Sequence, residues 1–237
     1  MPDAQPPLPT LAVLGGTGKE GPGLALRWAL AGYPIIIGSR QLEKAQATAE
    51  ALVKEVRQYL EIHPTASPGS ITGLENGDAA RQADISVLTV VASAHQPALE
   101  SIKNDLKGKI LVDATARVDF RDPRPPAPPA AARLAQDILG PEARVVAAFQ
   151  NVPAHSLKKN LGGSLNADVL VCADDLEAAK AVIALTEAIG LRAYYAGGLD
   201  NALVVESLTC LLISLNKYYG AKTASIMVSG IPGASAP

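Results

Sequence analysis

Three glycines near the N-terminus, Gly16, Gly18 and Gly21, have the spacing G-x-G-x-x-G in the segment LAVLGGTGKEG. In a dinucleotide site, the first glycine permits a tight turn out of a strand, and the second lets the backbone approach a pyrophosphate. The third lets a helix pack closely on the strand. The unpaired N–H groups at the start of that helix then face the phosphates. The residues between the glycines are expected to line the turn, mainly through their backbone: Thr17, Lys19 and Glu20.

The surroundings of this motif decide between a nucleotide site and an ordinary glycine turn, which can have the same spacing. An apolar run precedes the motif, and a helix-like stretch opens at its last glycine. A second apolar run, residues 35–37, follows at the distance expected for a strand–helix–strand unit. The motif binds dinucleotides in this context. We therefore predict nucleotide binding.

The second apolar run leads into Gly38, Ser39 and Arg40, and Lys44 follows four residues later. Sites for NAD commonly have a carboxylate here, which accepts hydrogen bonds from ribose hydroxyls and would repel a phosphate. A hydroxyl, a guanidinium and an ammonium instead suit the 2′-phosphate of NADP, because arginine forms a charge-assisted fork with phosphate. We predict a preference for NADP(H). The alternative is that Arg40 and Lys44 are solvated charges at the start of a helix.

Groups that could move a proton are sparse, although a dehydrogenase of alcohols needs one. The three histidines, His63, His95 and His155, are scattered along the chain. Asp113 ends a strand-like run, where it would either face the site or cap the next turn. No spacing in the sequence indicates zinc or another metal. We therefore predict a reaction that needs no proton relay from the protein, or one whose relay the sequence does not identify.

Composition is typical of a soluble α/β protein. The 237 residues are 48% hydrophobic and 19% charged, and the net charge of −2 argues against nucleic acid as a partner. The two cysteines, Cys172 and Cys210, are not spaced as metal ligands and are expected to be reduced thiols of a cytoplasmic protein. Residues 1–10 lack the apolar core of a signal peptide. The apolar runs are too short to span a membrane.

Strand-like and helix-like segments alternate along the first two thirds of the chain. Such alternation predicts βαβ units, and hence an α/β fold with a Rossmann-type, doubly wound parallel sheet. The strands are expected at residues 11–14, 35–37, 85–91, 110–112 and 145–149, and the helices at 21–31, 42–59, 97–106 and 130–139. Residues 122–129, DPRPPAPP, must form a surface loop because proline cannot continue a helix or a central strand.

The pattern restarts after residue 155. Two further strands, ADVLVCADD and LRAYYAGG, flank the amphipathic helix DLEAAKAVIALTEAIG. A last helix, about residues 200–219, is apolar on most faces and is expected to be deeply buried. We therefore predict two domains: residues 1–155 bind the nucleotide, and residues 156–237 form a smaller C-terminal domain that closes over it.

Four segments together resemble one known family. They are AVLGGTGKEGPGLALRWALAGYPIIIGSRQLEKA, DISVLTV, VVAAFQNVPA and LVVESLT. They are similar to the corresponding parts of the NADP-dependent reductases of the deazaflavin coenzyme F420, and the similarity covers nearly the whole chain. The resemblance implies a Rossmann domain with a small C-terminal domain, a homodimer, and NADP(H) and coenzyme F420 as small-molecule partners.

The resemblance also implies roles for individual residues. The pyrophosphate would be held by Thr17, Gly18, Lys19 and Glu20, and the 2′-phosphate by Ser39, Arg40 and Lys44. The other positions border the rings: Val90 and Val91 at the sheet edge, Asn151, Val152, Pro153 and Ala154 by the nicotinamide, and Ser207 and Thr209 near the deazaflavin. The sequence departs from the family at Gln150, a position near the reacting rings where some members have histidine.

Two alternatives remain at this stage. The same scaffold could serve an NADPH-dependent reductase of another acceptor, such as a flavin, an imine or a ferric ion. It could also serve a sensor that binds NADP without chemistry. The apolar last helix, which carries Glu206, Ser207 and Thr209, favours an enzyme, because it suits a closed site beside the nicotinamide.

Overall fold

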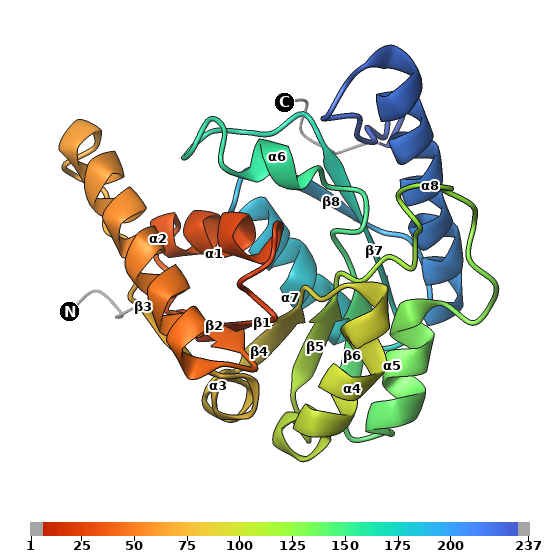
Figure 1. The fold of residues 1–237 in the computed structure, drawn as a ribbon, viewed down its shortest axis with the longest axis horizontal. Helices are drawn as coiled ribbons and strands as arrows, with labels where there is room; N and C mark the ends of the chain where they lie inside the picture. Colours follow the sequence, from red (N-terminus) through yellow and green to blue (C-terminus); the bar gives the residue numbers. More distant parts are fainter. Residues whose placement is uncertain (1–6, 232–237) are drawn as a thin grey trace.

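The computed structural model describes residues 7–231, and its centre is one eight-stranded sheet (Figure 1). The prediction that residues 1–10 are not a signal peptide concerns a segment of which residues 1–6 lie outside this range. In chain order the strands are β1 (Leu11–Leu14), β2 (Ile35–Ser39), β3 (Ile71–Glu75), β4 (Ile85–Leu88), β5 (Ile110–Asp113), β6 (Arg144–Ala147), β7 (Asp168–Ala173) and β8 (Arg192–Tyr195).

The order of the strands is β3-β2-β1-β4-β5-β6-β7-β8, and the pairs from β3 to β6 are all parallel. The chain moves outward from β1 to β3 and then crosses to the other side of β1 to form β4. Open α/β sheets bind ligands at this reversal, outside the carboxyl ends of the strands. The predicted Rossmann-type, doubly wound sheet is confirmed.

Helices cover both faces of the sheet. The α-helices are α1 (Gly21–Leu30), α2 (Leu42–Ile62), α3 (Asn76–Gln82), α4 (Ala92–Ile102), α5 (Ala131–Leu139), α6 (Ala154–Leu157), α7 (Leu176–Glu187) and α8 (Ala202–Tyr219). Two 3₁₀ turns, η1 (Lys103–Leu106) and η2 (Leu199–Asn201), adjoin α4 and α8.

Alternation along β1 separates the two cores. Leu11 and Val13 lie in the core formed with α1, α2 and α7, whereas Ala12 and Leu14 lie in the core formed with α3, α4, α5 and α8. Successive side chains of a strand point to opposite faces, so a strand with helices on both sides is apolar throughout. The run LAVL, which is fully buried, is therefore the expected sequence of a central parallel strand.

Strand β3 and helix α3 were not identified from the sequence. Strand β3, ITGLE, lies at the edge of the sheet and is only partly buried, so it lacks the apolar run that marks the central strands. A Cβ on its Gly73 would lie 2.5 Å from the backbone of Ala45 in α2. Glycine, which weakens a strand signal, is therefore needed here for close packing of the helix.

Residues beyond 155 continue the same sheet. Strand β7 pairs with β6 in the antiparallel sense, and β8 pairs with β7 in parallel. Helix α7 packs in the same core as α1 and α2. The division into a nucleotide domain and a C-terminal domain at residue 155 stays a prediction. Residue 155 lies between β6 and β7, which are hydrogen-bonded to each other in the sheet.

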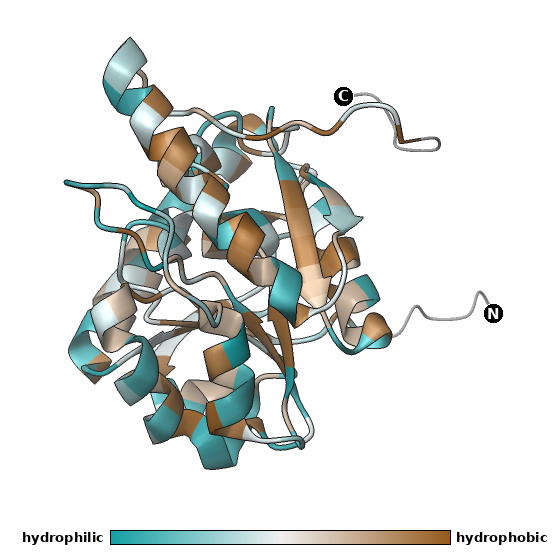
Figure 2. Ribbon diagram, turned by 90° about the vertical axis from the view of Figure 1, so that its right-hand side faces the viewer, coloured by the Kyte–Doolittle hydropathy of each residue, from teal (hydrophilic) through white to brown (hydrophobic). Residues whose placement is uncertain are grey.

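Helix α8 is not deeply buried, contrary to the prediction from its composition. Ala202, Val205 and Leu212 are buried, but Val204 and Leu211 are 63% and 59% exposed. The helix packs on the sheet with one side only, and Figure 2 shows hydrophobic residues recurring along it. The expectation that the apolar runs are too short to span a membrane was wrong for Leu199–Tyr219, which is long and apolar enough by length and hydropathy alone. Its buried Glu206, paired with Arg117, fits a helix packed on a globular protein.

Arg27 links α1 to the C-terminal third of the chain. Its side chain is 3% exposed, and its guanidinium donates hydrogen bonds to five backbone carbonyl groups. The acceptors are the carbonyl oxygens of Leu157, Lys159, Asn160, Gly163 and Ile189. Arginine has five N–H donors in a planar fork, so all of them can be satisfied here without a carboxylate. Burial lowers the pKa of the guanidinium.

Candidate functional site

The glycine turn after β1 has the tight geometry expected of the motif, but Gly15 makes the left-handed turn. Its φ is +65°, and its N–H donates to Oδ1 of Asn76 at 3.2 Å. At Gly16 a Cβ would lie 2.5 Å from the carbonyl oxygen of Val13. Both positions therefore require glycine for reasons within the fold. Asn76, at the start of α3, was missed because no motif links it to the turn.

Gly18 and Gly21 differ in the space around them. A Cβ at Gly21 would lie 2.7 Å from Cα of Gly16, so this glycine allows α1 to approach the turn. A Cβ at Gly18 would have no neighbour closer than 3.7 Å. Thr17, Gly18 and Lys19 are exposed. The fold itself therefore leaves Gly18 free, which agrees with a requirement imposed by a bound ligand.

Glu20 precedes α1 and has an unusual carboxyl group. Its Oε1 atom is buried and has no hydrogen-bond partner among residues 7–231. Burial raises the pKa of this carboxyl to about 8. Glu20 is therefore mostly uncharged at neutral pH, when it would not repel a pyrophosphate bound at the start of the helix.

We expect NADPH binding to weaken as the pH rises through about 8, because Glu20 then becomes negatively charged. A carboxylate about 5 Å from a phosphate charge repels it by about 3 kcal/mol at an effective dielectric constant of about 20. With salt screening, we expect roughly tenfold weaker binding at pH 9.5 than at pH 7. Fluorescence titration of NADPH across this range measures the effect. Glu20→Gln should flatten the profile, and an equal pH dependence in that variant would contradict the prediction.

The three predicted groups of the 2′-phosphate site lie at the end of β2 and the start of α2. Ser39 is buried, and its Oγ atom accepts a hydrogen bond from the N–H of Gln41 at 3.3 Å, which leaves its own proton available. Arg40 and Lys44 are exposed and have no ion-pair partner among the described residues. Unpaired cations beside a hydroxyl donor fit a phosphate.

Val90 and Val91 follow β4, which ends at Leu88 rather than at residue 91 as predicted. Val90 is partly buried and packs so closely that a Cβ at Gly15 would lie 2.5 Å from its Cγ1. Val91 is 67% exposed just before α4. Both therefore lie at the carboxyl edge of the sheet, and Val90 directly adjoins the glycine turn.

The turn after β6 is held by an aromatic residue in an unfavourable backbone conformation. Phe149 has a φ of 76° and is buried. Its ring packs edge-to-face on Trp28 with centroids 5.7 Å apart. Non-glycine residues in this region are strained and tend to cluster at functional sites. The turn orients the five residues predicted to border the rings: Gln150, Asn151, Val152, Pro153 and Ala154.

Hydrogen bonds join this turn to α8. Thr209 donates its hydroxyl proton to the carbonyl oxygen of Gln150 at 3.0 Å. The Nδ2 atom of Asn151 donates to the carbonyl oxygen of Val205 and to Oγ1 of Thr209, both at 3.0 Å. The structure thus brings the predicted residues Gln150, Asn151 and Thr209 together. The hydroxyl of Ser207 is bonded within its own helix, to Leu203.

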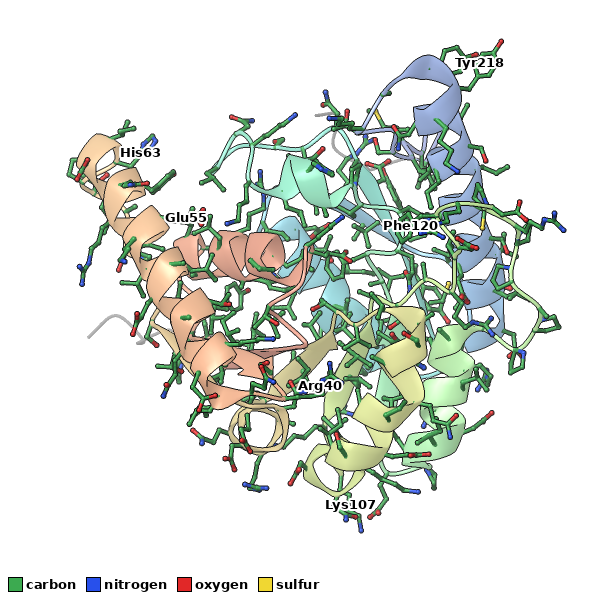
Figure 3. All side chains as sticks on the ribbon, viewed as in Figure 1. Arg40, Glu55, His63, Lys107, Phe120 and Tyr218 are labelled. Carbon is green, nitrogen blue, oxygen red and sulfur yellow. The ribbon has the colours of Figure 1, made fainter. Side chains whose placement is uncertain are left out.

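His95 and Asp113 form a buried pair that the sequence did not connect. His95 lies in α4 and Asp113 ends β5, and the distance from Nε2 to Oδ2 is 2.7 Å. Asp113 also accepts the N–H of Thr115 at 2.9 Å, so it caps the following turn as well. The other two histidines, His63 after α2 (Figure 3) and His155 in α6, are exposed.

Glu206, on the last helix α8, holds the proline-rich loop. Its carboxylate accepts hydrogen bonds from the backbone N–H of Arg117 at 2.7 Å and from the Nε–H of the same residue at 2.8 Å. It also accepts the N–H of Ala131 at 3.0 Å. These residues lie on either side of the loop 122–129, so one buried carboxylate anchors both ends of the loop to α8.

Comparisons with known proteins agree with this geometry. Residues 10–117 match the family model described as NADP oxidoreductase coenzyme F420-dependent. The chain is 38% identical over 232 residues to the F420-dependent NADP reductase of Methanothermobacter marburgensis, with 94% of this chain and 99% of the relative covered. It is 39% identical to the enzyme of the same name from Methanocaldococcus jannaschii, with 93% and 98% covered.

A solved structure has the same fold over almost the whole chain. It is that of a proposed F420-dependent NADP reductase from Arthrobacter sp. FB24, with a TM-score of 0.73 and 26% sequence identity. The alignment covers 94% of this chain and all of that one. The similarity therefore includes the C-terminal strands and α8 as well as the glycine turn.

Proposed function

The chain belongs to the family of F420-dependent NADP reductases, and on this premise we propose that it transfers a hydride between NADP(H) and the deazaflavin coenzyme F420. The observation that carries the proposal is similarity to these reductases across both the dinucleotide half and the half that carries α8. Similarity limited to the nucleotide-binding half would not identify the hydride acceptor.

The arrangement of the site supports this reaction. Hydride transfer between two ring carbons needs the rings stacked with those carbons about 3–3.5 Å apart and water excluded. The sheet edge beside Val90 would receive the nicotinamide. The turn that carries Gln150 and Asn151, bonded to Thr209 of α8, would form the wall around the second ring. The Pro153 ring stiffens this wall because it fixes φ.

The NADP(H) and F420 groups fit the residues that are present. Gly18 has no neighbour that would clash with a Cβ, so its exposed backbone is free to meet the pyrophosphate. Buried oxygen atoms of Gln150 and Asn151 lack partners beside the expected ring positions. The alternative acceptors, a simple flavin, an imine or a ferric ion, would use the same NADPH site. A sensor would bind NADPH without consuming it in the presence of any acceptor.

Direct transfer is tested with NADPH that carries deuterium on one face of nicotinamide C4. Mixed with the protein and oxidised F420, one of the two labelled forms should deliver deuterium to C5 of the deazaflavin without exchange into water. Label released into solvent would exclude direct transfer. Turnover with a simple flavin or an imine, together with no turnover of F420, would assign the chain to the alternative.

We also propose that the protein is a homodimer that associates through α8. Val204, Leu211, Leu215 and Tyr218 are large apolar residues that are at least 46% exposed, and their spacing places them along one side of the helix. Sedimentation should give a dimer for the wild type and a monomer for Leu211→Glu. Lys54→Glu, on exposed α2, is the control and should stay dimeric. A monomeric wild type would contradict the proposal.

We propose that the protein is cytoplasmic. Cys172 and Cys210 are both buried free thiols, as expected where disulfides are rare. Burial raises the pKa of the Cys172 thiol to about 11, so it stays protonated and unreactive at neutral pH.

A further inference from the structure

The side-chain amide of Gln150 has only one possible orientation. Its Nε2 atom lies 2.8 Å from the backbone carbonyl oxygen of Asp113. A carbonyl oxygen accepts hydrogen bonds and cannot donate, so the NH₂ group and not the oxygen must face it. The Oε1 atom of Gln150 therefore points elsewhere. It is buried and has no hydrogen-bond partner in the described part of the chain.

The amide of Asn151 is fixed in the same way. Its Nδ2 atom contacts the carbonyl oxygen of Val205, which can only accept. It also contacts Oγ1 of Thr209, whose single proton is donated to the carbonyl of Gln150. Both neighbours therefore require a donor, and the NH₂ group supplies it. The Oδ1 atom of Asn151 is left buried and without a partner among residues 7–231.

The surrounding structure keeps these two amides in place. The side chain of Asp113 is held between His95 and the N–H of Thr115, so the carbonyl that orients Gln150 belongs to a rigid strand end. Phe149 fixes the backbone just before Gln150. Gln150 and Asn151 are 8% and 5% exposed. Neither amide can turn without breaking a bond and burying its NH₂ group unpaired.

Two buried amide oxygens without partners need an explanation. Leaving a buried acceptor unsatisfied costs about 1–3 kcal/mol, and native proteins keep very few such groups. Here the two lie on adjacent residues, at the sheet edge where the proposed function places the coenzyme rings. The missing partners are therefore expected to come from the bound molecules.

We propose that the side-chain oxygens of Gln150 and Asn151 accept hydrogen bonds from N–H groups of the coenzyme rings, so that this site selects rings carrying an amide or imide N–H. The proposal rests on the proposed function. Two sources have this chemistry: the carboxamide of the nicotinamide and the ring imide of the deazaflavin. A histidine at position 150 would instead present a ring nitrogen whose donor or acceptor state depends on its proton.

Analogues without these N–H groups test the proposal on the wild-type protein. One is the NADPH analogue in which an acetyl group replaces the carboxamide, and the other is the deazaflavin methylated at the imide nitrogen. Each is compared with its parent by equilibrium fluorescence titration, which requires no turnover. We expect at least one analogue to bind about tenfold more weakly than its parent, equivalent to about 1.4 kcal/mol. The affected analogue identifies the source of the N–H.

Variants then assign the effect to a residue. In Gln150→Leu or Asn151→Leu, the parent should bind more weakly and the difference between parent and analogue should largely disappear. Ser214→Ala is the matched control, because the Ser214 hydroxyl is bonded within α8, to the carbonyl oxygen of Cys210. That variant should keep the wild-type difference.

The proposal is overturned if both analogues bind the wild type as tightly as their parents, which would mean that water satisfies the two oxygens. A difference that persists unchanged in both leucine variants would also overturn it. If the deazaflavin parent does not bind at all, the proposed acceptor is wrong. The NADPH arm then decides the inference alone, because it is measured without deazaflavin.

Discussion

Gly18→Val is expected to abolish NADPH binding while the protein stays folded. The fold has room for the new side chain, because a Cβ at this position has no neighbour closer than 3.7 Å and the residue is exposed. The branched side chain would instead occupy the space through which the backbone approaches the pyrophosphate. We expect a loss of at least about a hundredfold in affinity, equivalent to about 2.7 kcal/mol. Titration with NADPH measures it, and thermal unfolding shows that the fold is intact.

Gly16→Val is the contrasting variant. Its Cβ would lie 2.5 Å from the carbonyl oxygen of Val13, so this change should lower the melting temperature as well as remove binding. Unchanged NADPH affinity in a folded Gly18→Val protein would show that the phosphates bind elsewhere.

Arg40→Ala should weaken NADPH binding and leave NADH binding nearly unchanged. Arg40 is exposed, and no carboxylate of the described residues competes for it, so its guanidinium is available to a 2′-phosphate. Hydrogen bonds to charged groups contribute about 1.5–3 kcal/mol, which corresponds to a loss of roughly ten- to more than a hundredfold. The measurement is the ratio of the two dissociation constants, because only NADPH carries the phosphate.

Arg57→Ala is the matched control for this charge. Arg57 is also exposed but lies further along α2, so its removal should leave the ratio unchanged. Equal weakening of NADPH and NADH by Arg40→Ala would mean that Arg40 does not recognise the extra phosphate. Loss of the preference in both variants would point to general attraction by positive charge.

The sequence predicted those parts of the fold and site that local patterns encode. The run LAVL, the glycine spacing and the Ser39–Arg40 pair each lie within a few residues, and their type and order identify a strand, a turn and a phosphate site. The edge strand β3 was not predicted because it is short, partly polar and interrupted by Gly73. Apolar composition also overstated the burial of α8, because composition does not reveal how many sides of a helix are covered.

The rest of the site depends on contacts between distant residues. The pair of His95 and Asp113 spans 18 positions, and the bond from Gln150 to Asp113 spans 37. Glu206 and Arg117 are 89 positions apart, so the sequence did not show that the Glu206 carboxylate anchors a loop. No periodicity encodes these pairings. They follow from the sheet order, which brings the carboxyl ends of β5 and β6 together.

The five carbonyl groups that surround Arg27 have a consequence for the order of folding. They lie 130 to 162 positions later in the chain. During synthesis, this arginine therefore leaves the ribosome long before any of its acceptors exists, and water must solvate its five donors until then. Helix α1 cannot bury that side earlier without leaving a desolvated cation unpaired, which is costly. The first helix of the chain thus completes its packing only after residues 157–189 have been made.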